Sequence, residues 1–182
     1  MRRKDDTLRD TLLALARETA DREGLEAVNI RALAGRAGVA AGTVYNYFSS
    51  KDEILLALTE EYWRGALEEM DAAVTAGDFC GQVREIFLFV RERLQRSAGT
   101  LMGSLDKVET AGQERMAAMK GRLERDLVRR MEGDPSIRGE VWDGDFTRER
   151  FARFLMGNMT ALWREKEPDV DLLLAVIRKT IY

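Results

Sequence analysis

The chain has 182 residues and a net charge of −3, with 45% hydrophobic residues, 34% charged residues and two prolines, which is typical of a helical globular protein. It has no histidine and one cysteine, Cys80, which excludes a Ser-His-Asp triad, a Cys-His dyad, the common zinc sites and an internal disulfide. We therefore expect no enzyme and no cofactor, and, because no run of about 18 apolar residues occurs, a cytoplasmic protein that does not contact a membrane.

Three short amphipathic segments begin the chain. Apolar residues at helical spacing predict a first helix that ends before Gly24, a residue that can adopt a positive φ at a helix end. Asn29 is a suitable N-cap for a second helix over 30–37, and Gly38 ends that helix. A third helix is predicted over 41–48. Two short helices joined by a glycine-containing turn form a helix-turn-helix.

The third predicted helix would present one face to DNA, because the second helix of a helix-turn-helix enters the major groove. The helical spacing predicts that Val44 and Phe48 face the interior. In the alternative interpretation the helix pair does not bind DNA, and Tyr45 and Phe48 are ordinary aromatic residues of a core. The remaining side chains offer hydroxyls for phosphates, an amide for a base edge and cations on either side. The candidate DNA-binding residues are Arg31, Ala41, Gly42, Thr43, Asn46, Tyr47 and Lys51.

The distribution of charge supports nucleic-acid binding only modestly. Residues 1–51 contain nine Lys or Arg and seven Asp or Glu, a net charge of +2, which leaves −5 for the rest of the chain. A positive net charge is expected of a DNA-binding segment, but the difference in net charge between the two parts of the chain is small. The prediction of DNA binding therefore depends on the motif rather than on the charge.

Further helices follow the predicted helix-turn-helix. Ser50 and Glu53 form a capping box that starts a fourth helix, whose apolar stripe continues to about Val74. Gly133-Asp134-Pro135 is the clearest break in the rest of the chain. More helices are predicted at about 83–94, 101–110, 113–131, 147–166 and 170–181.

Four short motifs follow one another within residues 37–52. They are an Ala-Gly-Val turn, a Gly-Thr-Val-Tyr helix, a Tyr-Phe pair and a Ser-Lys-Asp start of the next helix. In this register they resemble the signature of the tetracycline-repressor (TetR) family. The resemblance covers about residues 8–60, a third of the chain.

The chain departs from the family pattern at three positions. Ala40 stands where the family has a serine or threonine cap, Ala41 where a basic or polar residue is common, and Ala20 where an aromatic residue is common. Loss of the cap typically costs about 1 kcal/mol of helix stability. We therefore expect fewer polar contacts with DNA than usual, and an affinity that depends on Arg31, Thr43, Tyr47 and Lys51.

The resemblance implies an all-α regulator of about nine helices with two domains. Residues 1–53 would form the helix-turn-helix DNA-binding domain, with its motif at 29–48, and residues 54–182 an effector-binding and dimerisation domain. It implies a ligand-released repressor that acts as a homodimer on a palindromic operator. The expected partners are double-stranded DNA, a second copy of the chain and an unidentified small-molecule effector. A helical protein-binding adaptor and an activator remain as alternatives.

The last two predicted helices are expected to form a four-helix bundle with those of a second subunit. Both have apolar residues at helical spacing, which would serve equally as ordinary core within one subunit. The candidate dimer-interface residues are Phe151, Phe154, Leu155, Met159, Leu162, Leu172, Leu173, Val176 and Ile177.

Methionine and aromatic residues of the second domain suit an adaptable apolar pocket or an ordinary core. Cys80 is expected to be a packing residue, with a redox-sensitive thiol as the alternative. Two acidic pairs, Glu60-Glu61 and Asp143 with Asp145, do not make an acid–base site, because the first pair faces different ways on a helix and the second lies in a predicted loop. The candidate pocket residues are Tyr62, Trp63, Phe87, Phe89, Leu101, Met102, Met116, Met119 and Trp142.

Overall fold

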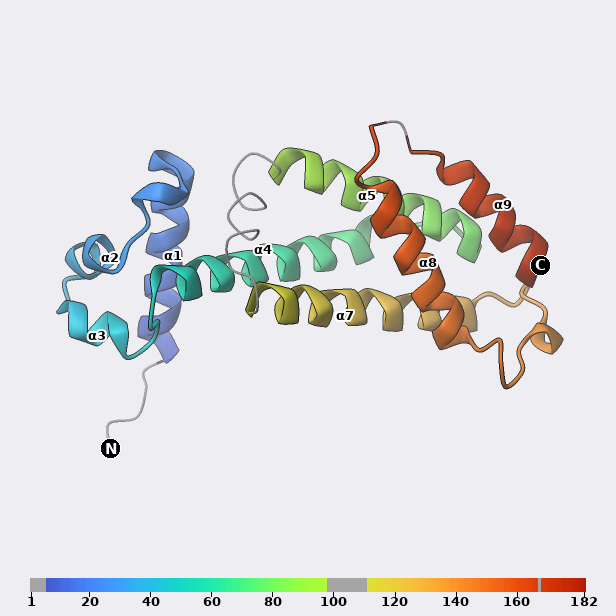
Figure 1. The fold of residues 1–182 in the computed structure, drawn as a ribbon, viewed down its shortest axis with the longest axis horizontal. Coiled ribbons are helices and arrows are strands. Elements are labelled where there is room, and N and C mark those ends of the chain that lie inside the picture. Colours follow the sequence, from blue (N-terminus) through green and yellow to red (C-terminus); the bar gives the residue numbers. More distant parts are fainter. Residues whose placement is uncertain (1–5, 98–110, 167) are drawn as a thin grey trace. The chain divides into compact units, whose positions relative to one another are not determined.

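A computed structural model describes residues 6–97, 111–166 and 168–182 (Figure 1). These residues form eight α-helices and two short 3-10 turns and no strand, which confirms the predicted all-α fold. The helix predicted at 101–110 lies outside the described residues. The elements are α1 (Asp6–Glu23), η1 (Leu25–Ala27), α2 (Ile30–Ala37), α3 (Ala41–Tyr45), α4 (Lys51–Ala73), α5 (Phe79–Ser97), α7 (Ala111–Gly133), η2 (Gly139–Val141), α8 (Arg148–Leu162) and α9 (Val170–Ile181).

The helices that open the chain begin and end where local chemistry predicts. Gly24 has a φ of 84° and follows the last residue of α1. The Asn29 side chain caps α2 by accepting a hydrogen bond from the Ala32 amide at 2.9 Å. Gly38 ends α2 in the left-handed conformation, with φ 67° and ψ 28°. Only glycine adopts these positive φ values without strain, so both turns are determined by the sequence.

The junction between α3 and α4 differs in part from the sequence prediction. The α-helical part of α3 ends at Tyr45, because the amides of Tyr47 and Phe48 both donate to the Val44 carbonyl in a tight turn. The predicted cap of α4 is present, since Ser50 Oγ accepts from the Glu53 amide at 3.2 Å. The Glu53 carboxylate accepts from the Ser49 amide at 2.6 Å, one residue before the expected partner.

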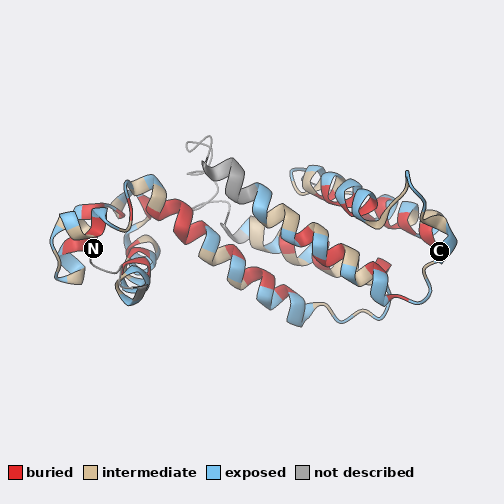
Figure 2. Cartoon of the chain, turned by 90° about the horizontal axis from the view of Figure 1, so that it is seen from below, coloured by how far each residue is buried: buried red, intermediate tan, exposed pale blue. Residues whose placement is uncertain are grey.

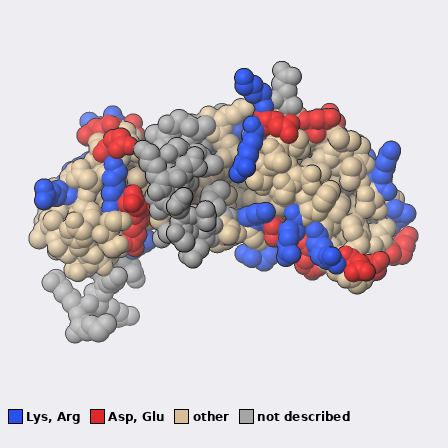
Figure 3. Space-filling view, in the orientation of Figure 1, with Lys and Arg blue, Asp and Glu red and all other residues tan. Residues whose placement is uncertain are grey.

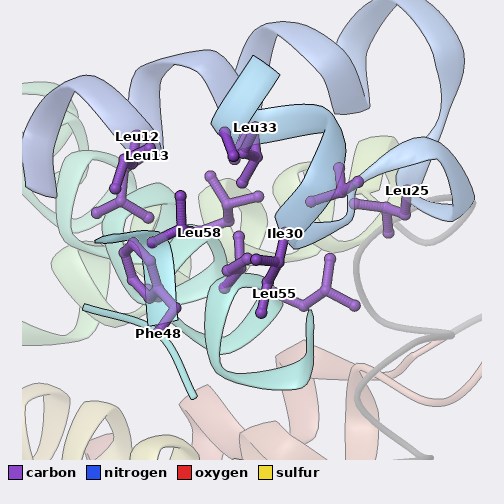
Figure 4. Close-up of a cluster of buried hydrophobic side chains, with 14 residues drawn as sticks. Leu12, Leu13, Leu25, Ile30, Leu33, Phe48, Leu55 and Leu58 are labelled. Carbon is purple, nitrogen blue, oxygen red and sulfur yellow. The ribbon is translucent and has the colours of Figure 1, made fainter. Parts of the chain in front are cut away.

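The described residues form two compact units, 6–65 with 97 and 111–115, and 66–96 with 116–166 and 168–182. The first unit, here called the head, has a core in which side chains of α1, α2 and the first turns of α4 meet, with Phe48 at one end of the cluster (Figure 4). Because α4 supplies part of this core, the head extends past residue 53. The buried core residues are Leu12, Leu13, Ala16, Leu25, Val28, Ile30, Leu33, Ala34, Val44, Phe48, Ile54, Leu55, Ala57 and Leu58.

In the second unit, the Asp134 carboxylate connects the ends of three helices. It follows α7, accepts a hydrogen bond from the Phe79 amide at the start of α5 at 2.8 Å, and accepts another from the hydroxyl of Tyr182 after α9. Burial raises the pKa of Asp134, but these hydrogen bonds and those from Ser136 outweigh it, so the net pKa is lowered. Burial and the bond to Asp134 raise the pKa of Tyr182.

Buried and exposed residues alternate along the helices of the second unit, as amphipathic helices require (Figure 2). The α9 bounds are those predicted, and α8 ends at Leu162, before the predicted 166. Within the described part of the chain, no helix is both long enough and apolar enough to span a bilayer.

Candidate nucleic-acid interface

Packing of the head fixes which side of α3 faces solvent. Val44 and Phe48 are 0% and 1% exposed and lie in the head core with Leu33, as the spacing predicts (Figure 4). Ala37, at the end of α2, is half-buried and packs against the same core. Because two residues of the α3 segment are anchored in the core, its opposite side is held outward in a fixed orientation.

The outward side of α3 carries a small, polar surface. Gly42 and Asn46 are exposed, while Ala41 and Thr43 are half-buried. Tyr47 is half-buried and packs against the head core, so its ring supports the turn after α3. Gly42 has no side chain, so the backbone there can approach DNA closely. The side-chain amide of Asn46 can contact a base edge.

Tyr45 belongs to this outward side, which the sequence analysis did not predict. Its side chain is 57% exposed, so it is not a core aromatic residue. Helical spacing contains the signal, because residues three and four apart share a face and Tyr45 is three residues after the exposed Gly42. A phenolic hydroxyl at this position can donate to a phosphate or a base edge.

The two candidate cations of the interface have different surroundings. Arg31, in the first turn of α2, is exposed and makes no ion pair with any residue that the structure describes. Lys51, in the first turn of α4, donates from Nζ to the Glu26 backbone carbonyl at 3.1 Å and to the Glu26 carboxylate at 3.3 Å. Lys51 is therefore held by the η1 turn instead of extending freely.

Other basic residues of the head hold its helices together. Arg36 of α2 donates to the Glu18 carboxylate of α1 at 2.6 Å, and Arg17 of α1 pairs with Glu61 of α4. Arg9 lies over the Phe48 ring, 5.5 Å from its centroid. Basic and acidic side chains accordingly lie next to one another on the drawn face of the head (Figure 3). This arrangement explains why the head shows no strong single-sign charge.

The predicted dimer-interface residues divide into a buried and an exposed set. Phe151, Leu155, Met159, Leu173 and Ile177 are buried in the core of their own unit, as the alternative interpretation anticipated. Leu162 is half-buried. The outward set consists of Phe154 at 48%, Leu172 at 65% and Val176 at 36% exposed. Both helices therefore have an inner apolar face and a second, outer one.

The candidate pocket residues occur in more than one place. Trp63 is buried and contacts the half-buried Tyr62 edge to face, at 5.6 Å between ring centroids. In the second unit, the buried Phe87 stacks on Trp163, and the half-buried Trp142 stacks on Phe146. Phe89 and Met119 are half-buried; Leu101 and Met102 lie outside the described residues, as does the side chain of Met116.

Cys80 is a packing residue in the second unit. Its side chain is 1% exposed, and Sγ lies 3.6 Å from the Leu174 carbonyl oxygen. Burial raises the pKa of the Cys80 thiol, which disfavours the reactive thiolate. These observations favour the packing interpretation over a redox-sensitive thiol.

Comparison with known proteins identifies the head. Residues 12–58 match the family model for bacterial regulatory proteins of the tetR family. Over these residues the chain is similar to the TetR family of regulators. This match includes the whole predicted motif, the α4 residues of the head core and the outward face of α3.

Similarity to a curated protein extends beyond the head. The HTH-type transcriptional repressor KstR2 of Mycobacterium tuberculosis is 31% identical over 101 residues, 56% of this chain and 44% of KstR2. The chain thus spans less than half the length of this curated relative in the match.

Solved structures are similar over nearly the whole chain. A Rhodococcus sp. RHA1 protein has a TM-score of 0.62 at 16% identity, covering 95% of this chain and 94% of that one. A Saccharomonospora viridis protein in complex with choline has a TM-score of 0.52 at 17% identity, covering 96% and 95%. These identities establish a shared fold only.

Proposed function

We propose that this protein is a sequence-specific DNA-binding repressor of the TetR family that acts as a homodimer on a palindromic operator and is released by a small molecule. The observation that carries the proposal is the anchoring of Val44 and Phe48 in the head core, which leaves Gly42, Tyr45 and Asn46 on the open side of α3. Repression is the activity named for the similar KstR2 protein.

Selection of bound duplexes from a random-sequence pool tests DNA recognition. We expect a palindrome whose half-sites are centred about one helical turn, or a multiple of it, apart. Gly42→Glu is a suitable control, because a Cβ at Gly42 meets nothing within 4 Å and the added carboxylate would repel phosphates. Enrichment of no common sequence by the wild-type protein, or the same enrichment by the control, would contradict the proposal.

The outer apolar faces of α8 and α9 support a homodimer. Phe154, Leu172 and Val176 are large apolar residues that water would surround in a monomer. Large contiguous apolar patches are rarely exposed on soluble monomers and are typical of protein interfaces. A second copy is the occupant expected, because a palindromic operator requires two heads related by a two-fold axis.

Helix α4 supports ligand release, because it contributes to both units. Its first turns place Ile54 and Leu58 in the head core, and its later turns place Leu67 and Met70 among the buried residues of the second unit. A ligand that binds preferentially to a state whose two heads are wrongly spaced for the operator would release DNA. A coupling free energy of about 1–3 kcal/mol corresponds to a five- to roughly hundred-fold loss of DNA affinity.

Ligand release is tested by titrating the selected duplex in the presence of small molecules that raise the melting temperature of the protein. We expect at least one of them to weaken DNA binding at saturation. A compound that binds the second unit at saturation and leaves the DNA affinity unchanged would contradict the coupling.

A further inference from the structure

Lys51 and Glu26 form an ion pair next to the proposed DNA-binding side of the head. Lys51 Nζ lies 3.3 Å from Glu26 Oε2, and the side chains are 33% and 92% exposed. The same ammonium donates to the Glu26 backbone carbonyl at 3.1 Å. Two oxygens of Glu26 therefore accept hydrogen bonds from the ammonium that the sequence predicts to contact DNA.

The position of the pair makes Glu26 a competitor of DNA. Lys51 opens α4, where exposed backbone amides and the positive end of the helix dipole already favour an anion. The Glu26 carboxylate lies beside the Lys51 ammonium and carries a negative charge of its own. A phosphate that approaches Lys51 finds two of its three N–H donors engaged and is repelled by the carboxylate.

We propose that Glu26 limits the DNA affinity of the protein by holding Lys51. This inference rests on the proposed DNA-binding function and adds a residue to it that touches no base or phosphate. Glu26 contributes nothing to the head core, because its side chain is almost fully exposed. Its carboxylate can therefore be changed without disturbing the fold, and its backbone carbonyl remains as a partner of Lys51.

The magnitude follows from the strength of exposed ion pairs. Such pairs are worth little, so their release corresponds to a change of about two- to five-fold in an equilibrium constant. In a dimer whose two heads both bind DNA, the gains in affinity from the two heads multiply, to about four- to twenty-five-fold. Both Lys51 interactions are screened by salt, so the effect should be largest at low ionic strength.

The test compares Glu26→Gln with Glu23→Gln, a matched control that removes the same charge from an exposed residue three positions earlier. Binding to a fluorescently labelled duplex of mixed sequence is measured by anisotropy across a range of salt concentrations. Each variant is also made in a Lys51→Ala background, and melting temperatures are compared. We expect Glu26→Gln, but not Glu23→Gln, to bind more tightly than the wild type, with a smaller gain once Lys51 is absent. The melting temperatures of the Gln variants should lie within a few degrees of those of their parents, because an exposed ion pair contributes little to stability.

The outcomes separate the inference from the proposed function. If the wild-type protein binds no duplex, the proposed function fails and this inference fails with it. If the wild type binds but Glu26→Gln binds equally or more weakly, Glu26 does not compete and instead is neutral or positions Lys51 for phosphate. A gain of the same size in the Lys51→Ala background, or with Glu23→Gln, would show a general charge effect and overturn the role of the pair.

Discussion

At the scale of single residues, Asp134 shows how one carboxylate stabilises the second unit. It accepts hydrogen bonds from the Phe79 amide, the Ser136 amide and the Tyr182 hydroxyl. Its pKa is lowered in the folded protein, so the unfolded chain binds a proton more tightly. The resulting stability is present above the unfolded pKa of about 3.9 and is lost as the pH falls through the folded pKa.

Asp134→Asn is therefore expected to destabilise the protein by about 1–3 kcal/mol near neutral pH, because an amide replaces a charged acceptor of three hydrogen bonds. The difference from the wild type should shrink in acid. Urea unfolding at several pH values measures it, and Tyr182→Phe is the companion variant, since it removes one donor and keeps the ring. A difference that is constant with pH would show that the charge of Asp134 is not involved.

Asn46 is the residue on the outward side of α3 best suited to read a base. Asn46→Ala should lower the affinity for the selected duplex by about 1–3 kcal/mol, which is the cost of one lost bidentate base contact. Its affinity for mixed-sequence DNA should change little, because phosphate contacts dominate that binding. Anisotropy with the two duplexes separates these effects. An equal loss on both would assign Asn46 to the backbone instead.

At the scale of elements, the start of α3 has no side-chain cap. Ala40 has an extended backbone suited to an N-cap, but its side chain makes no capping bond. Ala40→Ser should add a hydroxyl acceptor for the Gly42 or Thr43 amide and stabilise the protein by about 0.5–2 kcal/mol. Thermal unfolding measures this, with Ala41→Ser, one residue inside the helix, as the control. Equal effects of the two serines would contradict capping.

Elements defined by local chemistry could be predicted from the sequence, and those defined by tertiary contacts could not. Asn29 and Gly38 determine the bounds of α2 through their own side chain and backbone, and α9 begins and ends as predicted. The pairing of Lys51 with Glu26 and the burial of Leu173 beside the exposed Leu172 depend on how distant segments pack. Periodicity alone cannot decide them, because it identifies an apolar face without naming what covers it.

At the scale of the whole molecule, neighbouring leucines of α9 have different environments. Leu172 is 65% exposed on the outer apolar face, and Leu173 is 5% exposed in the core of the second unit. The sequence analysis assigned both to the dimer interface, because spacing cannot distinguish a two-faced helix from a broad single face. Charge placed at each position should therefore have different consequences.

Leu172→Glu should leave the fold intact and convert the proposed dimer to a monomer, because it places a carboxylate in the interface but not in the core. A monomer presents one head, so binding to a palindromic duplex should fall to that of a single half-site. Leu173→Glu should instead lower the melting temperature sharply by burying an unpaired charge. Light scattering and thermal unfolding of both variants distinguish the two cases. A Leu172→Glu protein that remains dimeric would place the interface elsewhere, and would leave Phe154 and Val176 exposed for another reason.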